Sequence, residues 1–164
     1  MTNLLHINGG ECLLIFKSNL IKLDFFMNGI VVANNYAELS LSDKEQVLNL
    51  LQENGRALEF ANQQLRADKE LVLCAVRQKG RALKFASPEL KNDFECVLAA
   101  VTQNGKALEY ASDELKSNVD IVIAAVSNNG SALIFAADEL QSNSSVVLAA
   151  VAQNGGALKF AADN

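Results

Sequence analysis

The sequence repeats with a period of 25 residues, and this periodicity constrains the fold more than any single residue does. The same apolar phrase, as in NGRALEFA and NGKALEYA, begins at each of five evenly spaced glycines: Gly55, Gly80, Gly105, Gly130 and Gly155. One unit of this length cannot bury an apolar face alone. We therefore expect the units to stack into a solenoid in which each unit packs on its neighbours.

The first half of each unit has the features of a capped helix. Each unit begins with a residue type that is preferred at helix N-caps: Asp43, Asp68, Asp93, Asn118 and Asn143. An apolar run such as Leu71–Val76 follows, and the glycine comes four residues after the end of the run. This predicts a helix of about 10 to 11 residues. A glycine after a helix commonly adopts the left-handed conformation, so we expect Gly105→Val to cost on the order of 1 kcal/mol.

The second half of each unit indicates a shorter helix. Apolar residues at 82, 83, 85 and 86 fit about two helical turns packed on the first helix. Ser87-Pro88 is a helix-start signal and predicts one extra turn. One leucine column is expected to fill the core between units: Leu65, Leu90, Leu115 and Leu140. The predicted fold is all-α, an α-solenoid of about five 25-residue helical repeats with an atypical N-terminal segment.

A leucine-rich repeat is the alternative for this period, because its units are 20 to 29 residues long and contain a strand. In that interpretation the apolar run would be a buried strand. The run contains paired alanines such as Ala99-Ala100, and alanine favours helices over strands. The N-caps also favour the helix.

The periodicity weakens before Asp43, which divides the chain into residues 1–42 and the tandem repeats of residues 43–164. Terminal solenoid units are commonly atypical, so residues 1–42 are interpreted as an N-terminal cap or degenerate repeat. A small β element is the alternative, because residues 12–16 and 20–26 are rich in branched and aromatic side chains. At the other end the repeat stops before its leucine column, which fits a fragment of a longer array or an end that another copy covers.

Composition excludes several function classes. A net charge of -5 argues against nucleic-acid and anionic-membrane binding, and no stretch is long and apolar enough for a membrane helix. His6 is the only histidine, and Cys12, Cys74 and Cys96 lack metal-ligand spacing. Cys74 and Cys96 fall in apolar repeat columns and are expected to be buried, reduced thiols. We predict no catalytic site, no metal and no cofactor.

The phrase D-x-E-x-V-L-x-A-V-x-Q-N-G-x-A-L-x-F-A-x-x-E-L resembles the repeat of the family called domain of unknown function 4116 (DUF4116). The best matches are residues 68–90, 93–115 and 143–164. The resemblance covers about residues 43–164 and implies a tandem array of helical repeats. Many arrays of this kind occur in intracellular bacteria. The resemblance implies no activity, and no catalytic residues are transferred from it.

Variable repeat columns are the candidate partner surface. One basic column contains Arg56, Arg81 and Lys106, and another contains Arg66, Lys91 and Lys116. Stacking would turn each column into a stripe that attracts an acidic partner. The alternative is a solvated face balanced by the neighbouring acidic column of Glu89, Glu114 and Glu139.

Ile134 stands apart, because it is an apolar residue in an otherwise charged column and is a candidate contact residue. The predicted function is a non-enzymatic protein–protein interaction scaffold. It would act in the cytoplasm or, as part of a bacterial effector, in the cytosol of a host cell. The alternative is a structural protein that self-assembles head to tail into oligomers or filaments.

Overall fold

The computed structural model describes residues 5–8, 11–16, 19–26, 30–32 and 44–161. The chain divides between residues 40 and 41 into two compact units, which are treated separately below. The predicted boundary, between residues 42 and 43, lies outside the described residues and close to this division.

The N-terminal unit contains an antiparallel sheet with the strands in sequence order. Its strands are β1 (Leu5–Asn8), β2 (Glu11–Phe16), β3 (Asn19–Phe26) and β4 (Ile30–Val32). The prediction of a degenerate helical repeat is wrong for these residues, and the alternative of a β element describes them. The physical reason is composition, because β2 and β3 consist largely of branched and aromatic residues, which favour strands.

The second unit is the predicted α-solenoid. Each repeat begins with a ten-residue helix: α1 (Lys44–Glu53), α3 (Lys69–Gln78), α5 (Phe94–Gln103), α7 (Val119–Asn128) and α9 (Ser144–Gln153). The predicted N-caps from residue 68 onward are confirmed; the Asp93 side chain, for example, accepts from the Cys96 N–H at 3.0 Å. Asp43 lies outside the described residues. The strand interpretation of the apolar run is wrong.

The second half of each repeat is a six-residue 3-10 helix rather than two α-helical turns. These helices are η2 (Gly55–Phe60), η3 (Gly80–Phe85), η4 (Gly105–Tyr110), η5 (Gly130–Phe135) and η6 (Gly155–Phe160). The residue before each glycine is extended; Asn104 has φ -152° and ψ 106°. Its side chain accepts from the Lys106 N–H at 3.1 Å, so one asparagine ends the long helix and begins the 3-10 helix.

The predicted extra turn is present as a four-residue helix that links each repeat to the next. These helices are α2 (Gln63–Arg66), α4 (Pro88–Lys91), α6 (Asp113–Lys116) and α8 (Asp138–Gln141). Ser87 is the N-cap of α4 and Pro88 its first residue, as predicted. The leucine of each short helix is buried, which confirms its expected place between units.

The glycines have a different role from the one predicted. None of the five glycines has a positive φ, so the prediction of a left-handed conformation is wrong. A Cβ added to Gly105 would collide with the carbonyl oxygen of Ala125 in the next repeat. The Gly105 N–H also donates to Asn128 Oδ1 of that repeat at 2.7 Å. Glycine is needed here because two backbones approach closely.

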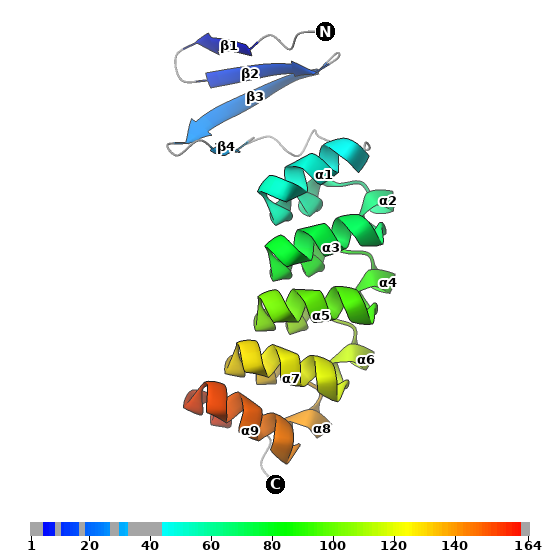
Figure 1. The fold of residues 1–164 in the computed structure, drawn as a ribbon, viewed down its shortest axis with the longest axis vertical. Helices are drawn as coiled ribbons and strands as arrows, with labels where there is room; N and C mark the ends of the chain where they lie inside the picture. The colour runs from blue at the N-terminus through cyan, green and yellow to red at the C-terminus, as the bar shows by residue number, and fades with distance from the viewer. Residues whose placement is uncertain (1–4, 9–10, 17–18, 27–29, 33–43, 162–164) are drawn as a thin grey trace. The chain divides into compact units, whose positions relative to one another are not determined.

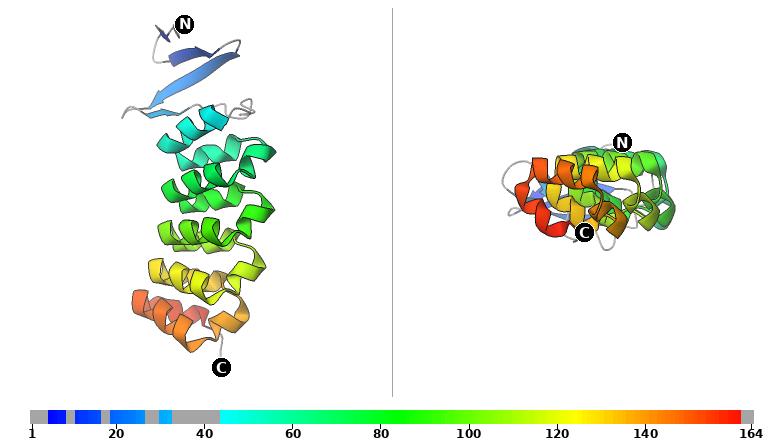
Figure 2. Two further views of the ribbon diagram at one scale, coloured as in Figure 1. Left: turned by 45° about the vertical axis from the view of Figure 1, so that its right-hand side comes forward. Right: turned by 90° about the horizontal axis from the view of Figure 1, so that it is seen from below.

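The core lies between two layers of helices. Figure 1 shows the long helices side by side in sequence order, and Figure 2 shows the same stack from two further directions. The three middle long helices, α3, α5 and α7, each bury four positions completely, for example Leu71, Val72, Ala75 and Val76 in α3. The 3-10 helices contribute buried leucines such as Leu108. The opposite side of each long helix is therefore left at the surface.

Candidate interaction surface

The first predicted basic column lies on the 3-10 helices, where its side chains are exposed and mostly paired. Arg56 Nε lies 2.9 Å from Glu59 Oε2. Arg81 Nη2 donates to the Tyr110 hydroxyl at 2.6 Å, and its guanidinium lies 5.6 Å from the centre of that ring. These contacts occupy two of the three cations. Two of the three cations therefore have partners within the repeats, and a role of this column in binding an acidic partner stays a prediction.

The second predicted basic column has a structural role in the first repeat. Arg66 donates from Nε to the Ala61 carbonyl at 2.8 Å and from Nη2 to the Glu59 carbonyl at 2.6 Å. In the fourth repeat Gln141, in the same column, donates to the Ala136 carbonyl at 2.9 Å. These donors satisfy carbonyls at the C-terminal end of the 3-10 helix, where helices leave such groups unpaired. Hydrogen bonding thus accounts for part of this column.

The other two members of that column are half-buried lysines. Lys116 Nζ lies 3.5 Å from Asp113 Oδ1. Burial lowers the pKa of Lys91, and the charges of Arg66 and Lys84 lower it further. Both effects disfavour the charged ammonium, so Lys91 is less suited to a free basic stripe than an exposed lysine would be.

Ile134 is confirmed as exposed, with 49% of its surface accessible. It lies in η5, and its neighbours in the same column, Lys84, Glu109 and Lys159, are also exposed. Single exposed apolar side chains are common on protein surfaces. The structure therefore places Ile134 at the surface but brings no second exposed apolar side chain of this column beside it.

A second surface, which the sequence analysis treated only as core, covers the outer side of the long helices. We call it the long-helix face. Its apolar part consists of two half-buried or exposed columns: Leu48, Leu73, Leu98, Ile123 and Leu148, and beside them Cys74, Ala99, Ala124 and Ala149. Of each alanine pair, one member is buried and the other lies on this face; Ala100 is fully buried and Ala99 is not. The expectation that Cys74 is buried is therefore wrong, whereas Cys96 is buried as predicted.

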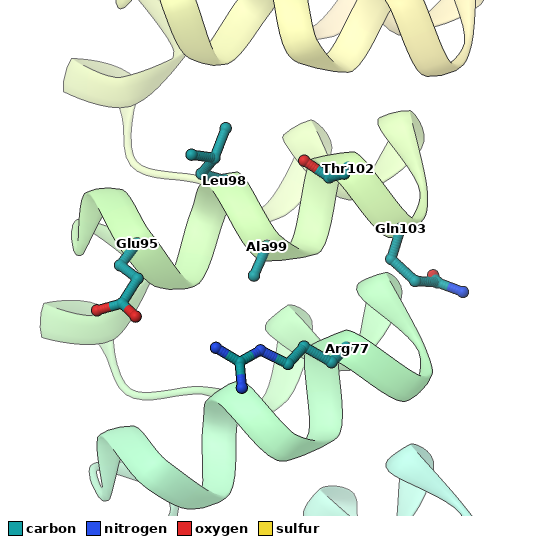
Figure 3. A pocket seen from close by; sticks show the side chains of 6 residues that line it. All are labelled: Arg77, Glu95, Leu98, Ala99, Thr102 and Gln103. Atoms are coloured by element: carbon teal, nitrogen blue, oxygen red, sulfur yellow. The ribbon is translucent and has the colours of Figure 1, made fainter.

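A shallow depression of about 440 Å³ lies on this face between α3 and α5. It is lined by Arg77, Glu95, Leu98, Ala99, Thr102 and Gln103. Figure 3 shows the Arg77 side chain extending along α3 next to Ala99, while Leu98 points towards the following helix. The equivalents of Arg77 in the next two repeats are the small residues Thr102 and Ser127, so the following spaces lack a long cation.

A ladder of ion pairs connects the N-terminal ends of the first three long helices. In each step a lysine at the first position of a helix reaches the N-cap and the second residue of the next helix. The pairs are Lys44–Asp68 at 2.8 Å, Lys44–Glu70 at 2.8 Å, Lys69–Asp93 at 2.9 Å and Lys69–Glu95 at 3.0 Å.

Hydrogen bonds to Asp93 and Glu95 raise the pKa of Lys69. Burial raises the pKa of Asp93, but the bonds from Lys69 and the Cys96 N–H outweigh it, so that pKa is lowered overall.

The ladder stops at the third repeat, where Phe94 takes the place of the lysine, and Val119 does so in the fourth. Phe94 is 45% exposed and Val119 is 42% exposed. Each lies four residues before a member of the apolar column, Leu98 or Ile123, and therefore on the same side of its helix. The apolar surface is wider at α5 and α7 than at α1 and α3.

No group of histidine, cysteine or acidic side chains within the described part of the chain is arranged to hold a metal ion. Burial, together with a hydrogen bond to Asp93, raises the pKa of Cys96 to about 12. None of the helices formed by the described residues is both long and apolar enough to cross a membrane.

Comparison with protein families gives one result. The model of the family described as domain of unknown function (DUF4116) matches residues 43–91, 68–116 and 118–164, which together span most of the chain. The chain belongs to the DUF4116 family. No curated protein and no solved structure matches it.

The DUF4116 matches agree with the repeat boundaries of the structure. Two of them begin at Asp68 and Asn118, which are the N-caps of α3 and α7. The match over residues 68–116 contains two long helices, α3 and α5, with the 3-10 and short helices that follow them. The resemblance seen in the sequence is thus confirmed. Because the family description names no function, a function for this DUF4116 chain has to be argued from its surface.

Proposed function

We propose that this chain is a non-enzymatic scaffold that binds a partner protein through its long-helix face. The observation that carries the proposal is the apolar band of leucine, isoleucine and alanine side chains that runs along this face. Exposed apolar surface of this kind is typical of sites that another protein covers. Stacked repeats bind partners through such extended surfaces.

The long-helix face is a better candidate than the basic columns that the sequence predicted. Arg56, Arg81 and Arg66 already hydrogen bond to groups of their own repeat or the next one. The apolar band, in contrast, has side chains that remain partly accessible in every repeat from α1 to α9. A partner gains more from covering apolar surface than from competing with existing hydrogen bonds.

Site-specific cross-linking tests the proposal. A photoreactive phenylalanine analogue would be placed at Thr102, which is exposed on the long-helix face, or at Glu139, which is exposed on α8 as a matched control. The chain would then be irradiated in lysate of the cells that produce it. We expect discrete protein adducts at position 102 and none at position 139. The same adducts at both positions, or none at position 102, would contradict the proposal.

Three related predictions have their own tests. Turnover of a substrate that depends on one residue of the repeats would contradict the non-enzymatic role. Head-to-tail self-assembly is the alternative function, and it predicts a mass that grows with concentration in light scattering. A constant monomer mass would exclude it. Residence in the cytoplasm or in a host cytosol remains a prediction, which localisation of the tagged chain would check.

A further inference from the structure

The end of the lysine ladder creates a distinct surface at the third and fourth repeats. In the first two repeats the side chain at the first helix position reaches the start of the next helix, as Lys69 does with Asp93 and Glu95. Phe94 and Val119 occupy the same position in α5 and α7 and are exposed. With the adjoining face residues they form what we call the α5–α7 patch: Phe94, Leu98, Ala99, Val119, Ile123 and Ala124.

The charged side chains of α5 and α7 are all acidic, and the cations near the patch, Lys69 and Arg77, belong to α3. Neither α5 nor α7 contains a lysine or arginine. Glu95 and Asp120 lie next to Phe94 and Val119 and are exposed. Glu95 is paired with Lys69, whereas the ladder supplies no lysine to Asp120, because Phe94 stands where that lysine would be. On the other side, Thr102 and Ser127 are neutral. The patch is thus apolar with an acidic border along the helix N-terminal ends.

The spacing of the two helices determines which partner element fits. Packed helices lie about 8 to 10 Å apart. A partner helix lying across α5 and α7 rises about 1.5 Å per residue, so apolar side chains about five to seven residues apart would contact both helices. Amphipathic helices have apolar side chains seven residues apart, which lies within this range. Basic residues on one flank would face Glu95 and Asp120.

We propose that the α5–α7 patch binds a basic amphipathic helix of a partner protein. This inference rests on the proposed scaffold function and adds the chemistry of the partner. Apolar side chains of the partner helix would cover Phe94 and Val119. They would also contact the patch alanines, which lie beside Leu98 and Ile123. Lysines or arginines of the partner helix would pair with the acidic border, which favours them over acidic residues.

A binding assay with two designed peptides tests this. Both would be labelled helices of about 18 residues with leucines at helical spacing; one carries lysine and the other glutamate at the remaining charged positions. Binding to the full chain would be followed by fluorescence anisotropy. We expect the lysine peptide to bind at least about tenfold more tightly than the glutamate peptide.

Variants of the chain identify the site. Phe94→Lys with Val119→Lys places in α5 and α7 the residue that α1 and α3 already carry, so the fold should be kept; circular dichroism would check it. We expect this variant to lose at least about tenfold in affinity for the lysine peptide. Ile134→Lys adds a charge on η5 and is the control, with unchanged affinity expected. Phe94→Ala removes the ring without adding charge and should weaken binding several-fold.

Three results would overturn the inference: equal binding of both peptides, full binding by the double lysine variant, or no binding of the lysine peptide. The cross-linking experiment separates this failure from that of the scaffold function. Adducts at Thr102 without peptide binding would leave the scaffold proposal in place with another kind of partner. Absence of both would contradict the two proposals together.

Discussion

The contact between Gly105 and the next repeat leads to a quantitative prediction. A methyl group on Gly105 would meet the Ala125 carbonyl oxygen far inside contact distance, and the Asn129 Cβ at 3.1 Å. Because the obstacle is backbone, no side-chain rotation relieves the collision. Gly105→Ala must therefore separate the third and fourth repeats or distort α7. It also strains the hydrogen bond from the Gly105 N–H to Asn128 Oδ1, which is 2.7 Å long.

The expected cost follows from these two contacts. Overpacking of a tight interior costs about 1 to 3 kcal/mol. Loss of the hydrogen bond adds about 0.5 to 1.5 kcal/mol. We therefore expect Gly105→Ala to lower the free energy of unfolding by about 1.5 to 4.5 kcal/mol. Urea denaturation followed by circular dichroism at equilibrium would measure the change.

Gly155 provides the matched control within the same chain. It occupies the same repeat position, but a Cβ added there has no atom within 4 Å. Its φ is not positive, so alanine is sterically allowed, and Gly155→Ala should be neutral or stabilise by up to about 1 kcal/mol. If the glycines were needed for a left-handed conformation, both substitutions would cost the same. Equal losses at the two positions would refute the packing argument.

Two further predictions concern the titratable groups. In the wild type, the bond from Lys69 lowers the pKa of Asp93 and stabilises the folded chain above about pH 4, the ordinary pKa of an aspartate. This stabilisation is lost as the pH falls through the lower folded-state pKa of Asp93. Lys69→Met removes the bond and with it the stabilisation. The difference in urea midpoint between wild type and variant should shrink on acidification, and a pH-independent difference would contradict this. In a Cys12→Ser background, Cys74 should react with a thiol reagent in the folded chain and Cys96 only after unfolding, because Cys96 is buried and its pKa is raised to about 12. Mass spectrometry would locate the modified thiol, and equal rates would show that Cys96 is accessible.

The repeat architecture was predictable because its signals are local. The Asp and Asn caps and the apolar run define a ten-residue helix within one unit, and Ser87-Pro88 defines the short helix. These features depend on the backbone of a single repeat. Stacking then follows from the period alone, since each unit leaves an apolar side uncovered.

Features that depend on the neighbouring repeat were missed. The role of Gly105 is set by Ala125, twenty residues away, and nothing within its own unit distinguishes close approach from a left-handed turn. The hydrogen bonds of Arg66 lie within its own repeat, but the sequence does not predict them either, because their acceptors are backbone carbonyls, which no sequence pattern displays. The widened apolar surface did leave a signal, namely the change from lysine to Phe94 and Val119 within one column.

The ion-pair ladder also bears on why the first position of the long helices changes from lysine to Phe94 and Val119 along the chain. Lys69 is 44% exposed and its partner Glu95 59% exposed, and exposed ion pairs contribute only about 0 to 1 kcal/mol. Replacing such a lysine by Phe94 or Val119 therefore removes little stability. The replacement does add exposed apolar side chains next to Leu98 and Ile123, which is unfavourable in water unless something covers them. Stability alone accounts for neither residue at these positions, whereas a partner that covers the α5–α7 patch accounts for both.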